Sequence, residues 1–146
     1  MSTSKKRDQL TATMFMELRR MVANSVLFNL RMAETLQVNP TDLQFINFLE
    51  LYGPLTPGRL AELSRLTTGG VTVVLNRLEK AGIVRRTANP DDRRSSIVSV
   101  DPKFLRSAQA AYGEMTDVTN ALLAQFSDKE LAVVAAFLKK ANDTRP

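Results

Sequence analysis

The sequence predicts a mainly α-helical fold of the α+β class, in which helices from both ends of the chain flank one small β-hairpin. Apolar residues recur at the spacing of amphipathic helices over most of the 146 residues. The helical spacing is lost between Ile83 and Val100, where two β-branched runs surround the turn residues Asn89-Pro90-Asp91-Asp92. Two long heptad-like seams, one near each end of the chain, predict helices that pack on other helices.

The first two helices are predicted from their spacing and from their end signals. Residues 8–36 lack proline and glycine, and from Leu18 onward their apolar positions alternate by three and four residues. Asn39-Pro40 is a cap followed by proline in the first turn, and Tyr52-Gly53-Pro54 ends the helix that begins there. One long helix and one shorter helix are therefore expected before residue 55.

Two short helices and a hairpin form the predicted centre of the chain. Thr56-Pro57 opens a third helix, Ser64-Arg65-Leu66 is a tight connection, and Thr67 caps a fourth helix that runs to about Lys80. The strands of the hairpin are expected over residues 83–88 and 95–100. The inner stripe of the fourth helix has the helical spacing of a buried face and consists of Val71, Val74, Leu75 and Leu78.

Two helices are expected after the hairpin. Asp101-Pro102 restarts a helix by the same combination of cap and proline, and its heptad seam runs from Leu105 to Phe126. Ser127-Asp128-Lys129-Glu130 is a capping box, in which the serine hydroxyl meets the glutamate amide and the glutamate side chain reaches back. A last helix is therefore predicted from this point.

The positive charge of the chain is concentrated in one segment. The chain has 20 Lys and Arg against 15 Asp and Glu, a formal net charge of +5. Residues 55–106 hold ten of the basic and five of the acidic residues, so they carry all of the excess and the remainder is neutral. Concentrated basic charge is typical of a partner that is a polyanion, although a solvated basic face explains it equally well.

The residues that are missing exclude many chemistries. The chain has no cysteine and no histidine, which removes thiol nucleophiles, disulfides, cysteine-based zinc sites and the Ser-His-Asp triad. There is no P-loop or GxGxxG motif, and a carboxylate-dependent hydrolase would need paired acids in a pocket, whereas Asp91-Asp92 lies at a turn. Neither an enzyme nor a cofactor or metal is expected. Because no apolar run approaches the ~18 residues of a membrane span and the amino terminus lacks the apolar core of a signal peptide, a cytoplasmic location is expected.

The order of short helix, tight turn, second helix and hairpin predicts a winged helix-turn-helix. In such a module the second helix enters the major groove of DNA, and the wing follows the backbone or the minor groove. A helical wheel of the fourth helix leaves an outer face without an acid. That face consists of Gly69, Thr72, Val73, Asn76, Arg77 and Lys80.

Each residue type on this outer face has a partner on the edge of a base or on a phosphate. Asn76 is expected to bond adenine bidentately, and Thr72 and Val73 to contact a thymine methyl group. Arg77 is expected to reach guanine or a phosphate. The alternative is that the face is only solvated.

The start of the fourth helix combines a cap with two glycines. Gly69 and Gly70 each cost about 1 kcal/mol of helix stability relative to alanine. In return they allow the free amides of the helix end, beside Thr67 and Thr68, to approach a phosphate or the groove closely. The alternative is that they only relax the helix start.

The remaining basic residues are candidates for the DNA backbone and the minor groove. Arg93 and Arg94 at the hairpin tip are suited to a narrow minor groove, and the alternatives are a solubilising tip or pairing with Asp91-Asp92. We expect one of the two arginines to be structural and the other to be inserted. Phosphate contacts are expected from Arg59, Arg65, Lys80, Arg85 and Lys103.

These residues resemble the MarR family of bacterial transcriptional regulators. The sequence departs from the usual pattern of that family at Val73, where a polar or basic residue is frequent, and at Asn76, where aspartate is frequent. It also has Thr67-Thr68-Gly69-Gly70 where a Ser-x-Ser/Thr pattern is frequent. The resemblance covers about 40 residues and runs through Leu60-Ala61-Glu62-Leu63, Val71-Thr72, residues 76–86 and residues 89–94.

The resemblance implies a homodimer that binds a pseudo-palindromic operator in double-stranded DNA. Its expected domains are an N-terminal dimerisation helix over 1–36, a DNA-binding lobe over 37–101 and C-terminal dimerisation helices over 102–146. The expected function is that of a repressor of nearby genes, and the alternative is a winged-helix module that binds an acidic protein.

The resemblance also implies a crevice in which an anionic or aromatic small molecule binds and releases the repressor. Plain core or dimer packing is the alternative for each candidate residue. The candidates are Met14, Met21, Phe28, Phe45, Phe48 and Tyr112.

Overall fold

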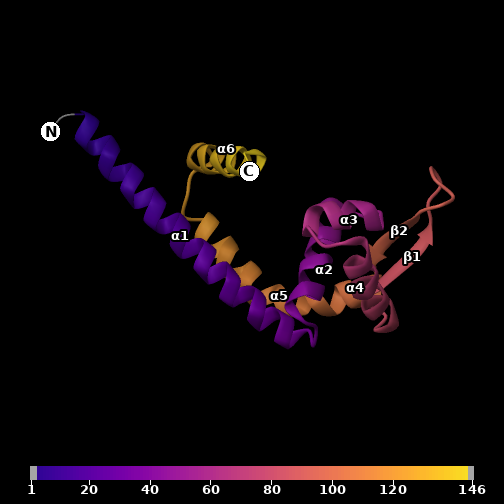
Figure 1. Ribbon diagram of the computed structural model, residues 1–146. Helices are drawn as coiled ribbons and strands as arrows, with labels where there is room; N and C mark the ends of the chain where they lie inside the picture. Colours follow the sequence, from indigo (N-terminus) through magenta and orange to yellow (C-terminus); the bar gives the residue numbers. More distant parts are fainter. Residues whose placement is uncertain (1–2, 145–146) are drawn as a thin grey trace. The chain divides into compact units, whose positions relative to one another are not determined.

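The structure of the protein is a computed structural model that describes residues 3–144. Over those residues the chain forms six helices and one two-stranded antiparallel sheet (Figure 1). It divides into two compact units, Met1–Ser107 and Ala108–Pro146. The elements are α1 Thr3–Thr35, α2 Pro40–Tyr52, α3 Pro57–Ser64, α4 Thr68–Lys80, β1 Val84–Ala88, β2 Ser96–Val100, α5 Pro102–Leu123 and α6 Asp128–Asp143.

Most helix starts lie where the capping signals predicted them. In α6 the capping box is complete, because Glu130 Oε2 also accepts a hydrogen bond from the Ser127 backbone N–H at 2.8 Å. The predicted mainly α-helical fold with one hairpin is therefore confirmed, and so are these local start signals. The caps whose side chains accept from the backbone N–H three residues later are Asn39, Thr56, Thr67 and Ser127.

Each strand begins one residue later than expected, and two helix boundaries differ by more. The first helix begins at Thr3, before residue 8, because the intervening residues include neither proline nor glycine and continue the helix readily. The fifth helix ends at Leu123, so Phe126 lies in the connection that leads to α6. Since Ser127 has to adopt an extended conformation to cap α6, the chain leaves the α5 helix before it.

The hairpin is joined to the lobe by more than its own pairing. Strand β1 pairs with β2 in a register that runs from Val84 opposite Val100 to Ala88 opposite Ser96. The backbone of Val98 also exchanges hydrogen bonds of 2.8 and 3.0 Å with Leu55, in the connection between α2 and α3. The base of the wing is therefore held by three backbone segments.

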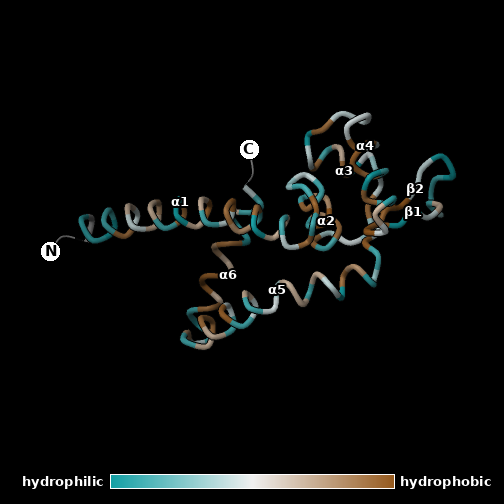
Figure 2. Tube along the Cα trace, turned by 90° about the horizontal axis from the view of Figure 1, so that it is seen from below, coloured by the Kyte–Doolittle hydropathy of each residue, from teal (hydrophilic) through white to brown (hydrophobic). Residues whose placement is uncertain are grey.

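The core of the first unit lies where α2, α3, α4 and the hairpin meet. The predicted inner stripe of α4 is buried along its whole length. Helix α2 contributes Phe45, Ile46, Phe48 and Leu49, which give this helix the apolar colouring of Figure 2. Burial of this apolar face fixes the rotation of α4, and so decides which of its residues face outward.

The junction between the hairpin and α5 depends on Asp101. The Lys103 backbone N–H donates to Asp101 Oδ1 at 2.7 Å, and the Arg85 guanidinium donates to Asp101 Oδ2. The hydrogen bond from the Lys103 backbone, and then the hydrogen bond and positive charge of Arg85, hold the pKa of Asp101 below its usual value of about 4.

This lowered pKa makes part of the stability depend on acid pH. The contribution is present above the unfolded-state pKa of about 4, and it is lost as the pH falls through the lower folded-state value. The thermal midpoint of Asp101→Asn should therefore fall less than that of the wild type between about pH 6 and about pH 3, because the variant lacks the titrating carboxyl group. Asparagine still caps the helix, so the variant keeps this part of the local structure. Thermal unfolding followed by circular dichroism measures this, with Asp117→Asn as the comparison for losing an exposed acid of α5. An equal acid-induced loss in wild type and Asp101→Asn would contradict the prediction.

Two further features concern the described part of the chain as a whole. Among residues 3–144, no helix has the combination of length and apolar content that crossing a membrane requires. Over the same residues, no group of three or more acidic side chains is placed to hold a metal ion.

Candidate nucleic-acid interface

The fourth helix presents an outer face that the fold itself does not use for packing. Thr72, Val73 and Asn76 are exposed on this face, while the neighbouring positions of the inner stripe are buried. Val73 is 60% exposed, although valine is among the residues most often found buried. The Thr72 hydroxyl donates to the Thr68 carbonyl at 2.9 Å, so its hydrogen is already engaged within the helix.

The two glycines at the start of α4 have different surroundings. At Gly70 an added Cβ would lie 3.4 Å from Thr67 Oγ1 and 3.6 Å from Leu66 Cβ, so this position faces its own cap. At Gly69 an added Cβ would meet nothing within 4 Å. Nothing in the described chain requires glycine at position 69, which is consistent with a partner that approaches the helix end closely.

Gly69→Ala should separate folding from binding. The substitution should leave the free energy of unfolding unchanged or raise it by up to about 1 kcal/mol, because alanine is the better helix former and has room. Binding to operator DNA should weaken severalfold, since the new methyl group would stand between the helix end and the DNA.

Gly70→Ala is the matched variant for this test, because its methyl group faces Thr67 instead of open space, and it should lose less affinity. Urea unfolding and fluorescence anisotropy with a labelled duplex measure the two effects. Equal affinities of Gly69→Ala and the wild type would remove the proposed close approach.

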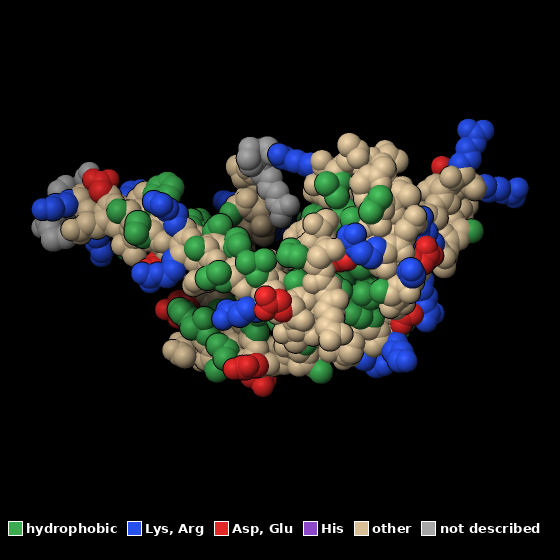
Figure 3. All heavy atoms as spheres, turned by 60° about the horizontal axis from the view of Figure 1, so that its bottom comes forward, with side chains coloured by type: hydrophobic (Ala, Val, Ile, Leu, Met, Phe, Trp, Pro, Cys, Tyr) green, Lys and Arg blue, Asp and Glu red, His purple; other side chains and the backbone are tan. Residues whose placement is uncertain are grey.

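The wing ends in two exposed arginines. Arg93 and Arg94 lie between β1 and β2 in an exposed turn, and Figure 3 shows basic side chains at the end of the lobe that carries the hairpin. One acid of the turn bonds to a backbone group, as Asp92 Oδ1 accepts from the Arg94 backbone N–H at 2.9 Å. Over residues 3–144, no ion pair joins either guanidinium to Asp91 or Asp92. The expected division into one structural and one inserted arginine is therefore not seen in the turn.

Arg77, for which a contact with guanine or phosphate was expected, forms an ion pair within the lobe. Its guanidinium binds the carboxylate of Asp42 through two hydrogen bonds of 2.8 and 2.5 Å. The Asp42 side chain is 5% exposed and lies in the first turn of α2, whereas the Arg77 side chain is 46% exposed. The hydrogen bonds with Asp42 raise the pKa of Arg77 above its usual range. The pair thus joins α4 to α2 and engages two N–H groups of the guanidinium, and contact of the remaining N–H groups with DNA stays a prediction.

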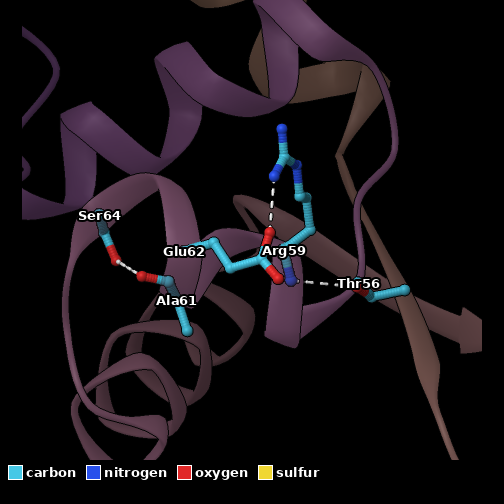
Figure 4. A network of polar contacts seen from close by, with 5 residues as sticks. All are labelled: Thr56, Arg59, Ala61, Glu62 and Ser64. Carbon is cyan, nitrogen blue, oxygen red and sulfur yellow. Dashed lines mark hydrogen bonds and ion pairs between the residues drawn. The ribbon is translucent and has the colours of Figure 1, made fainter. Parts of the chain in front are cut away.

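Of the other residues predicted to contact phosphates, Arg59 and Arg85 form ion pairs with acidic residues of the first unit. Arg59 bonds Glu62 Oε2 at 2.6 Å on the exposed side of α3, as Figure 4 shows beside the Thr56 cap. Arg85 pairs with Asp101 at the base of the hairpin. Arg65, in the left-handed turn before α4 with φ 58°, is exposed, and so are Lys80 and Lys103.

A further arginine, which the sequence reasoning did not single out, contacts the outer face of α4. Arg86 of β1 donates from Nη2 to Asn76 Oδ1 at 2.5 Å, and its Nε lies 3.2 Å from Glu79 Oε2. No local spacing indicates this contact, because it joins a helix to a strand ten residues away. The family pattern, with aspartate frequent at position 76, was the only available signal.

The candidate effector residues have different surroundings within their own units. Phe45 and Phe48 are 0% and 8% exposed and belong to the core of the first unit, which favours the packing alternative for both. Met14 and Met21 are about half exposed on α1. Phe28 is half-buried, and so is Tyr112 in the second unit.

Two open depressions in the first unit are lined by other residues than these candidates. The more apolar one, of about 330 Å³, is lined by Leu49, Glu50, Pro54, Ser99, Val100 and Leu105. Partial burial there raises the pKa of Glu50. The second is lined by Ala81, Gly82, Arg85, Asp101, Lys103, Phe104 and Ser107.

Comparisons with known proteins agree with this geometry. A family model described as the MarR family matches residues 36–95. The "Uncharacterized HTH-type transcriptional regulator YcgE" of Bacillus subtilis (strain 168) is 33% identical over 143 residues, which cover 98% of this chain and 93% of that protein.

Among solved structures, a MepR mutant from a multidrug resistant clinical isolate of S. aureus superposes with a TM-score of 0.70 at 19% identity, over 89% of this chain and 96% of that one. Another S. aureus MepR mutant, described as bound to an oligodeoxyribonucleotide, has a TM-score of 0.58 at 19% identity, over 89% and 96%. Such likenesses show the shared fold, and the family match and the B. subtilis relative show the lineage. The chain belongs to the MarR family of transcriptional regulators, which are winged-helix DNA-binding proteins.

Proposed function

We propose that this protein binds a pseudo-palindromic operator as a homodimer, represses nearby genes and is released by a small anionic or aromatic effector. In this proposal residues 37–101 contact the DNA, and residues 1–36 and 102–146 form the dimer. The observation that carries it is the outer face of α4, where exposed Thr72, Val73 and Asn76 lie on a helix whose opposite face is entirely buried.

The chemistry of the lobe supports DNA as the partner. Gly69, next to the helix cap, leaves room for close approach, and Arg93 and Arg94 stand exposed at the tip of the wing. The S. aureus MepR mutant described as bound to an oligodeoxyribonucleotide has the same fold. Thr67, Thr68 and Gly70 form the helix start that would face the DNA backbone.

The terminal helices support a dimer. Large apolar side chains are exposed on α1, among them Phe15 at 66% and Val22 at 62%. On α6, Val134 and Leu138 are 47% and 41% exposed. Large apolar side chains left exposed on one helix are typical of interaction surfaces in soluble proteins. A dimer would place two α4 helices about 34 Å apart, one turn of DNA.

Release by an effector would follow from a difference in affinity between two spacings of the lobes. A ligand shifts such an equilibrium only by as much as it prefers one spacing over the other. Met14, Met21, Phe28 and Tyr112 remain candidates for this role, because each keeps part of its surface accessible.

Duplex binding across a salt series tests the proposal. The full-length protein is titrated with DNA from the promoter of its own gene and with a scrambled duplex of equal length. We expect tighter binding to the promoter and a log–log salt slope of about −0.9 for each phosphate contacted. A slope near zero, or equal affinity for both duplexes, would favour the alternative of a winged-helix module for an acidic protein partner.

A further inference from the structure

The amide of Asn76 has one fixed orientation on the outer face of α4. Its Oδ1 accepts a hydrogen bond from Arg86 Nη2 at 2.5 Å. A guanidinium has five N–H donors and no acceptor, so the amide atom that faces it has to be the oxygen. The direction of this hydrogen bond therefore assigns the two ends of the Asn76 amide without ambiguity.

Arg86 also forms an ion pair with a second residue of α4. Its Nε lies 3.2 Å from Glu79 Oε2, and its side chain is 26% exposed. Asn76 and Glu79 are three residues apart, so they lie on neighbouring turns of one helix face and flank the same guanidinium. The backbone of Arg86 is paired with Val98 in the hairpin, so the arginine that donates to Asn76 starts from a fixed position on the strand.

The outward end of Asn76 then presents donors alone. Its Nδ2 carries two N–H groups, and no hydrogen bond of this nitrogen to another described residue is present. The side chain is exposed beside Thr72 and Val73. Bidentate recognition of adenine requires the amide oxygen to accept from N6–H₂ while the nitrogen donates to N7, and here that oxygen already accepts from Arg86. This engagement favours a base that offers acceptors over the adenine expected from the sequence.

We propose that Asn76 selects guanine, whose O6 and N7 are two adjacent acceptors in the major groove, and that Arg86 positions it for this selection. The inference rests on the proposed function, since it requires that α4 enters the major groove. Cytosine is disfavoured because its N4–H₂ group would meet a donor, and thymine offers only one acceptor. Asn76 is thus a specificity-determining residue, and Arg86 is a positioning residue.

Selection from randomised duplexes tests this inference with the full-length protein and three variants. Wild type should enrich guanine at one position of each half-site. Asn76→Asp still accepts a hydrogen bond from Arg86 but presents an oxygen outward, so the guanine preference at that position should fall about tenfold and cytosine should gain. Arg86→Met frees both ends of the amide, so adenine should rise relative to guanine at the same position.

Glu79→Gln is the matched control, because it removes a charge beside the same arginine but leaves the bond between Arg86 and Asn76. This variant should keep guanine at that position. Replacing that guanine with 7-deazaguanine removes the N7 acceptor, so it should weaken the binding of wild type about fivefold to tenfold and leave Asn76→Asp nearly unaffected. Thermal unfolding of each variant verifies that it is folded.

The outcomes separate the inference from the function on which it rests. Enrichment of adenine, cytosine or thymine at the position that Asn76→Asp changes would overturn the inference. So would a selected sequence that Asn76→Asp leaves unchanged at every position. If wild type selects no sequence at all, the proposed operator binding itself fails.

Discussion

Replacing Arg77 with methionine should lower the free energy of unfolding by about 2–3 kcal/mol, because it leaves the Asp42 carboxylate without its partner. The Asp42 side chain is 5% exposed, and it receives two hydrogen bonds from the arginine. Methionine keeps the apolar length of the side chain, so the loss reports on the charge pair. Urea unfolding followed by circular dichroism measures the effect.

Arg59→Met provides the matched control, since it removes the same kind of side chain from an ion pair that lies on the surface. Arg59 and Glu62 are 57% and 67% exposed, so this variant should change stability by less than about 0.5 kcal/mol. If Arg77→Met were no less stable than Arg59→Met, the pair with Asp42 would not hold α4 against α2. A preserved fold with weakened DNA binding would instead favour direct contact of Arg77 with DNA.

Removing both wing arginines should have the largest effect on DNA affinity. The Arg93→Ala, Arg94→Ala double variant should bind its operator about 10- to 100-fold more weakly at fixed salt, because two cations leave the minor groove or the backbone. Its stability should stay within about 0.5 kcal/mol of wild type, since both side chains are exposed. Fluorescence anisotropy across a salt series should show a slope reduced by about one to two.

The control for this experiment removes the same charge from another part of the chain. Lys139→Ala, Lys140→Ala also lowers the net charge of each chain by two, on exposed positions of α6. Because α6 lies in the proposed dimer region, size-exclusion chromatography verifies that this variant keeps the oligomeric state of wild type, and it should then bind nearly as tightly. Equal losses in the two double variants would mean that overall charge, and not the wing, accounts for the affinity. The single variants then show whether Arg94 or Arg93 carries more of the effect.

The local signals of the sequence predicted the elements well, because caps and breakers act within a few residues. Thr67 and Ser127 cap the helices they were expected to cap, and the inner stripe of α4 is buried. These features need only a helical period and a hydrogen bond across one turn. The same reasoning identified the exposed face of α4, since burying one side of a helix determines the other.

Contacts between residues far apart in the sequence could not be predicted from the sequence alone. Arg77 and Asp42 are 35 residues apart, and no spacing rule connects them, so the arginine was expected on DNA instead of on α2. The bond between Arg86 and Asn76 depends on how β1 packs beside α4, which is a tertiary property. The sequence does not show whether Phe45 and Phe48 lie in the core or line a pocket, because that depends on which face of α2 is buried.

The backbone bonds between Val98 and Leu55 determine how the wing can move. They add a third segment to the sheet at its base, and pairing of β1 with β2 continues to Ala88 and Ser96. Residues 89–95 lie beyond the last pair and include both tip arginines. The wing is therefore a stiff arm, and just beyond its last pair the Asn89 backbone N–H still donates to the Ser95 carbonyl at 3.3 Å. Adjustment to the local width of a groove would be left to the turn beyond that bond, which carries both tip arginines, while the angle between the arm and α4 is preserved.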